Sequence, residues 1–136
     1  MLQLKIEIDT KDFRLLNDLF ETEKRPEEGA TKQIAEGVII KYEKSETKII
    51  EEERSPDKLA FYIPPETLHL VIITTLNMGS SILASLISRW IYDKIKARNV
   101  EKIKIENVEI KIDRDSIKKA LEEVIADYLE KEKQKR

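Results

Sequence analysis

The chain has 136 residues and no cysteine, so we expect one domain and exclude disulfide frameworks, cysteine-based zinc sites and thiol catalysis. Its 25 basic and 27 acidic side chains nearly cancel, and net charge therefore gives no argument for binding nucleic acid or anionic lipid. Charged residues still make up 38% of the chain, and this bias toward Lys and Glu resembles proteins of thermophilic prokaryotes, such as archaea, or of their viruses.

The N-terminal segment predicts a strand followed by a helix. Leu2, Leu4, Ile6 and Ile8 alternate with polar residues, as on one face of a strand. A helix capped by residue 9 or 10 and ending near residue 22 comes next. There is no apolar secretory signal, so we expect a cytoplasmic protein.

Three short strands are predicted after a Pro- and Gly-containing loop. They cover residues 33–43, 47–53 and 58–63, and each has an apolar centre. Residues 44–46 and 55–57 have the composition of turns between them. We therefore expect an antiparallel meander in this part of the chain.

The next segment predicts one long helix from residue 65 to residue 97. Residues 67–88 contain no Lys, Arg, Asp or Glu, and a helix that is apolar nearly all round is buried in a core or a membrane. Three interpretations stay open: a helix packed on the sheet, a two-fold contact between subunits, and a transmembrane span. A stripe of mostly small polar residues at helical spacing marks a candidate interface, made of Thr74, Asn77, Ser81, Ser85, Ser88 and Tyr92.

The C-terminal third predicts a hairpin and a last helix. Strands at residues 100–105 and 108–112 flank a turn at Glu106-Asn107, a helix starts near residue 115, and residues 130–136 form a frayed polar tail. The whole order is β-α-β-β-β-α-β-β-α. It predicts a single α+β domain over residues 1–136, with a mostly antiparallel sheet, three helices and a long central apolar helix.

Few side chains suggest catalysis or metal binding. His69, the only histidine, has no adjacent nucleophile pattern, and the acidic run at residues 51–53 is typical of a solvated strand edge. Asp113-Arg114-Asp115 resembles half of a metal-binding loop, but it lies just before a helix, where Asp is a capping residue, and we prefer the capping interpretation. We therefore expect no catalytic residue, no metal and no cofactor.

A local basic cluster suggests a different function. Trp90 lies within it, and aromatic side chains among cations are typical of proteins that hold single-stranded nucleic acid. Interleaved glutamates and the favourable position of cations at a helix C-terminus are the competing explanation. The candidate nucleic-acid contacts are Arg89, Lys94, Lys96, Arg98, Lys102 and Lys104.

The second half of the chain also carries a family-like pattern. An apolar helix with small residues ends in Trp and Lys, and a hairpin and a final helix follow, carried by Gly79-Ser80-Ser81, Ala84, Trp90, Lys94, Val100 to Ile112 and Asp115 onward. Over residues 67–129 this order resembles the effector-associated constant-component domains of prokaryotic conflict systems. The hairpin turn lacks the glycine common in that family. The resemblance implies a non-catalytic coupling or assembly module and transfers no catalytic residue.

Our leading hypothesis is a non-enzymatic protein-interaction module that forms a homo-oligomer, preferably a dimer, through the candidate interface. The first alternative is a nucleic-acid-binding accessory protein. The second is a membrane-associated protein that inserts residues 67–88. A protein partner stays open, and nucleic acid and membrane are the less favoured partners.

Overall fold

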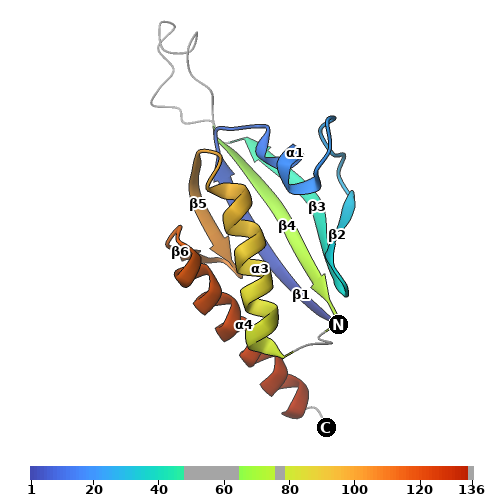
Figure 1. Cartoon of the computed structure of the whole chain (residues 1–136), viewed down its shortest axis with the longest axis vertical. Coiled ribbons are helices and arrows are strands. Elements are labelled where there is room, and N and C mark those ends of the chain that lie inside the picture. Colours follow the sequence, from blue (N-terminus) through green and yellow to red (C-terminus); the bar gives the residue numbers. More distant parts are fainter. Residues whose placement is uncertain (48–64, 76–78, 135–136) are drawn as a thin grey trace, which may run out of the picture.

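The computed structural model describes residues 1–47, 65–75 and 79–134. Their strands and helices follow the predicted order: β1 (Leu2–Thr10), α1 (Leu15–Phe20), β2 (Thr31–Ala35), β3 (Val38–Thr47), β4 (Glu66–Thr74), α3 (Ser80–Ile95), β5 (Val100–Ile105), β6 (Val108–Ile110) and α4 (Arg114–Gln134). The strands form one antiparallel sheet in the order β2-β3-β4-β1-β5-β6. The three helices of the described residues lie on the same face of this sheet (Figure 1). The predicted α+β class is confirmed.

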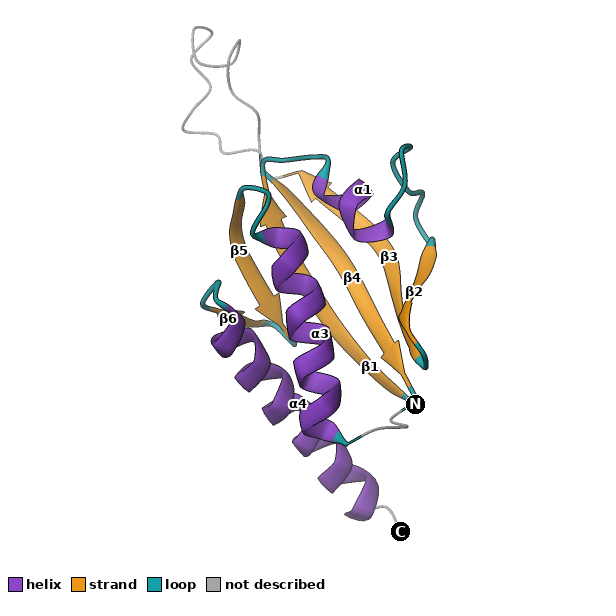
Figure 2. Ribbon diagram, viewed as in Figure 1, coloured by secondary structure: helices purple, strands orange, loops and turns teal. Residues whose placement is uncertain are grey.

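The core lies between the sheet and the helices (Figure 2). Even-numbered residues of β1 from Leu2 to Ile8 are buried, as period-two alternation requires, and the same face of β4 presents Leu68, Leu70 and Ile72 beside them. The inward side of α3 repeats at every fourth position, which is one helical turn. Its buried residues at this spacing are Leu83, Ile87, Ile91 and Ile95.

The long helix predicted for residues 65–97 is wrong in its first part. Residues 66–74 form β4, which pairs with β1 on one side and β3 on the other, and α3 begins only at Ser80. The run from Val71 to Thr75 consists entirely of β-branched residues, whose restricted χ1 angles favour a strand over a helix. Within the described part of the chain, no helix is long and apolar enough to cross a membrane.

The predicted strands before β4 also change. The strand predicted at residues 33–43 is a hairpin of β2 and β3, since Gly37 turns the chain with φ 77°. The turn predicted at residues 44–46 belongs to β3. The strands predicted at 47–53 and 58–63 lie outside the described residues, except for Thr47 at the end of β3.

The C-terminal hairpin and the start of the last helix agree more closely with the sequence, whereas the end of that helix does not. Glu106 and Asn107 have φ of 50° and 67°, and positive φ at both central residues suits a two-residue hairpin turn. Asp113 caps α4, because its Oδ1 accepts the backbone N–H of Ser116 at 2.7 Å. Residues 130–134 of the predicted polar tail continue the helix, consistent with the helix propensity of Lys, Glu and Gln.

The first helix is shorter than predicted. We expected it to begin at residue 9 or 10 and to end near 22, but β1 continues through Thr10 and α1 covers only Leu15–Phe20. Thr10 instead shapes the connection, because its Oγ1 accepts the N–H of Asp12 at 3.0 Å. Strand pairing with β4 and β5 therefore prevails over local capping at this point.

Candidate functional site

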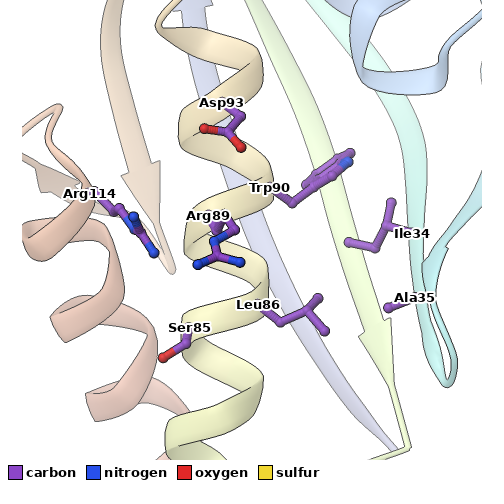
Figure 3. Close-up of a pocket in the computed structure, with 8 residues that line it drawn as sticks. All are labelled: Ile34, Ala35, Ser85, Leu86, Arg89, Trp90, Asp93 and Arg114. Carbon is purple, nitrogen blue, oxygen red and sulfur yellow. The ribbon is translucent and has the colours of Figure 1, made fainter.

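A pocket of about 510 Å³ lies between α3, β2 and the start of α4, and Figure 3 shows its lining. Leu86 and Trp90, one turn apart on α3, extend toward Ile34 and Ala35 of β2. All four side chains are half-buried, so the described residues leave the apolar wall that they form partly open. We call this cavity the α3 pocket.

Helical periodicity explains why this wall is left open. The residues that α3 buries recur at positions 83, 87, 91 and 95, directly over the sheet. Leu86 and Trp90 precede two of these positions by one residue, so they sit on the flank of the helix. Ile82 continues the same flank and is 63% exposed. These three residues, spaced by four, form an apolar row that we call the α3 ridge.

The polar rim of the α3 pocket carries net positive charge. Asp93 is the carboxylate on the rim, and its Oδ1 lies 3.2 Å from Nζ of Lys96. Arg89 and Arg114 complete the rim from α3 and α4. Neither guanidinium forms a hydrogen bond or ion pair with any residue that the structure describes. Both charges therefore stand beside an apolar wall without a counter-ion from the described chain.

The predicted interface residues do not all lie on one helix. Thr74 is buried in β4, and Asn77 lies outside the described residues. Ser81 faces α4, where its Oγ is 3.4 Å from Oε1 of Glu122. The other members on α3 are Ser85, which lines the α3 pocket, Ser88, which is fully buried and donates to the carbonyl of Ser85, and Tyr92, which is half-buried against the core.

The small polar stripe therefore has a structural explanation within the chain. The small side chains of Ser81 and Ser85 lie on the side of α3 that faces α4. Small residues allow such a close approach of two helices. The candidate subunit contact is not tested by a single chain, but its premise of one continuous helical stripe is wrong because β4 ends at Thr74.

The candidate nucleic-acid contacts are dispersed. Arg89 lies at the α3 pocket, whereas Lys102 and Lys104 alternate with the buried residues of β5 and so lie on the sheet face away from the helices. Four of the six are occupied by ion pairs: Lys94 with Glu21 at 3.2 Å, Lys96 with Asp93 at 3.2 Å, Arg98 with Asp18 at 2.7 Å, and Lys102 with Glu109 at 3.6 Å.

His69 lies on β4. The sequence had led us to expect it in the first turns of the long helix predicted for residues 65–97. Its Nδ1 is 3.7 Å from Oε1 of Glu7, and its Nε2 is 3.5 Å from Oε1 of Glu46. Nε2 is buried and has no hydrogen-bond partner among the described residues, so only a protonated His69 would form ion pairs with these carboxylates. Lys44 keeps the pKa of Glu46 below its usual value through a hydrogen bond, and the nearby His69 adds a smaller effect.

The described residues contain no group of three or more His, Cys, Asp or Glu side chains arranged to hold a metal ion. The acidic run at residues 51–53 lies outside them. Asp113, the other carboxylate considered, serves as the helix cap described above.

Comparison with known proteins adds no relative. No protein-family model matches the chain, and neither the curated proteins nor the solved structures gave a significant match. The resemblance to conflict-system domains therefore stays a prediction.

The sequence did not reveal the α3 pocket. Trp90 and Arg89 were singled out, but Ile34 and Arg114 come from elements far away in the chain, and only their packing brings them to α3. The one local signal is the spacing of Ile82, Leu86 and Trp90, a second apolar row on a helix whose core-facing row was already complete.

Proposed function

We propose that this chain is a non-enzymatic binding module that takes an apolar group of its ligand into the α3 pocket. The observation that carries the proposal is the open wall of Leu86, Trp90, Ile34 and Ala35. Ligand sites are concave, mostly apolar and supplied with a few polar groups, commonly with volumes of about 300–1,000 Å³. The α3 pocket, at about 510 Å³, fits this description.

A neutral apolar probe tests this proposal. Nile red fluoresces more strongly in apolar surroundings, and it should bind the purified protein with a single saturable transition. Ala35→Glu puts a carboxylate into the wall and should weaken binding by about tenfold, because the charge would have to be desolvated. Gln33→Glu is the matched control, because residue 33 is exposed on the same strand and does not line the pocket. Equal binding by both variants would refute the proposal.

The α3 ridge favours a second candidate, self-association. Ile82, Leu86 and Trp90 are symmetric about Leu86, so two antiparallel copies of α3 could pack with Ile82 against the Trp90 of the other copy. Two-fold interfaces need this kind of self-complementarity. The exposure of Ile82, at 63%, supports the candidate because a large aliphatic side chain stands in solvent.

Light scattering after gel filtration tests self-association. A dimer that becomes monomeric on Ile82→Glu, but not on Lys119→Glu at an exposed position of α4, would support it. A monomeric wild-type protein at high concentration would exclude it. The two candidates share Leu86 and Trp90, so a ligand in the α3 pocket should shift a dimer toward monomer.

A further inference from the structure

The charges around the α3 pocket restrict what can occupy it. Arg89 and Arg114 approach it from two different helices, and the nearest acidic group of the rim, Asp93, is already paired with Lys96. A ligand that contained only hydrocarbon would make no use of the two exposed guanidiniums. A ligand with a carboxylate would meet two planar donors, each able to form two parallel hydrogen bonds to it.

The apolar wall restricts the ligand in a second way. A small inorganic anion would contact the guanidiniums but would leave the wall of Leu86 and Trp90 in water. Burying that wall contributes to the free energy of binding in proportion to the apolar area removed from water. The two features together favour one molecule with an anionic end and an apolar body.

Nucleic acid fits these features less well. A polyanion needs a track of free cations along its backbone. The neighbouring cations Lys94, Lys96 and Arg98 are all held by carboxylates of the chain. Among the cations that line the α3 pocket, Arg89 and Arg114 have no partner in the described part of the chain, which matches a ligand with one anionic group.

We propose that the α3 pocket binds a small amphiphilic carboxylic acid, with the carboxylate between Arg89 and Arg114 and the apolar body against Trp90, Leu86 and Ile34. This inference rests on the proposed function, since it names the class of ligand that the same pocket takes. Ser85 lies at the α4 side of the pocket, where its hydroxyl is available as an additional donor.

The protein contains its own reporter of binding. Trp90 is the only tryptophan in the chain and lies in the wall of the pocket, so its emission reports occupancy without a label. The probes are decanoate, its neutral analogue decanol, and acetate as an anion without an apolar body. Decanoate should shift the Trp90 emission with a single saturable transition, decanol should bind about tenfold more weakly, and acetate should cause no saturable change at millimolar concentration.

Variants assign the binding to the arginines. Arg89→Gln and Arg114→Gln should each weaken decanoate binding by about tenfold and leave decanol binding unchanged. Lys118→Gln is the matched control, because it removes one positive charge from α4, where Lys118 pairs with Glu122 outside the pocket. A uniform loss in all three variants would indicate a general electrostatic effect and would overturn the inference.

The remaining outcomes separate this inference from the proposed function. If decanol binds as tightly as decanoate and neither arginine matters, the carboxylate assignment is wrong and the apolar pocket stands. If acetate binds as well as decanoate, the apolar wall is not used and the inference fails. If neither decanoate nor decanol perturbs Trp90 and Nile red does not bind, both proposals are overturned.

Discussion

Arg98 holds the carboxylate of Asp18 with two hydrogen bonds, from Nε to Oδ2 at 2.7 Å and from Nη2 to Oδ1 at 3.3 Å. Its Nη1 also donates to Asp12 at 3.2 Å. The bond to Asp18 is the main reason that the pKa of Arg98 is raised above its usual value. One side chain between α3 and β5 thus fixes both the short α1 helix and the turn before it.

Arg98→Lys should loosen α1 without unfolding the sheet. A six-residue helix is too short to be stable alone, and an ammonium cannot reproduce two parallel bonds from one planar group. Hydrogen–deuterium exchange should show faster exchange of the α1 amides, with little change in β1 and β4. Arg14→Lys, at an exposed position beside α1, should leave the exchange unchanged. Equal exchange in both variants would show that the guanidinium does not hold α1.

Ile72→Ala and Ile73→Ala should differ strongly in stability. Ile72 is fully buried under the helices, whereas the adjacent Ile73 is half-exposed on the other face of β4. Truncating a buried isoleucine costs about 2–5 kcal/mol, and the exposed position should cost less than about 1 kcal/mol. Urea unfolding of both variants measures the difference. Equal destabilisation would contradict the period-two pattern of β4.

Thr67→Val should destabilise the pairing of β4 with the end of β1. Thr67 Oγ1 donates to Asp9 Oδ1 at 2.7 Å, and both residues are buried. Valine keeps the shape but removes the donor from a buried carboxylate, which costs about 1–3 kcal/mol. Thr67→Ser retains the hydroxyl and should recover most of the loss. If urea denaturation gives the same free energy of unfolding for Thr67→Val and Thr67→Ser, this hydrogen bond adds no stability.

The Asp113 cap of α4 should make the stability of the protein depend on pH in the acidic range. Hydrogen bonds from the Ser116 N–H and hydroxyl lower the pKa of Asp113 below its ordinary value of 3.8. The carboxylate is therefore favoured in the folded state. Its contribution is complete above 3.8 and is lost as the pH falls through the lower pKa of the folded protein.

Asp113→Asn provides the comparison. Asparagine also caps helices but does not titrate in this range. The difference in urea stability between wild type and Asp113→Asn should shrink as the pH falls below 3.8, while other carboxylates titrate equally in both proteins. A difference that stays constant with pH would show that the Asp113 carboxylate is not favoured by the fold.

The sequence predicted the fold class and much of the C-terminal third, but it missed β4. The hairpin turn and the Asp113 cap depend on local backbone geometry, which residue types report directly. The segment from Leu68 to Thr74 is a mostly apolar run, and such a run is compatible with either a buried helix or a buried strand. It lacks the alternation of a half-exposed strand because both faces of β4 are buried or half-buried. Its β-branched run was the signal that favours the strand.

The α3 pocket could not be predicted because its parts are distant in sequence. Ile34 and Arg114 are separated by 80 positions and meet α3 only through the packing of β2 and α4 around it. Arg89 was singled out only as a member of the basic cluster. Lys94 and Arg98 were not recognisable as paired, since their partners Glu21 and Asp18 precede them by a long stretch of chain.

The central position of β1 in the sheet affects how the chain folds during translation. Both of its neighbours, β4 and β5, are translated much later, and the sheet cannot close until residue 105 has left the ribosome. Until then the apolar row from Leu2 to Ile8 has no permanent partner and is open to chaperones or to aggregation. Most of the strand pairing is long-range, so the chain should fold late and as one cooperative unit.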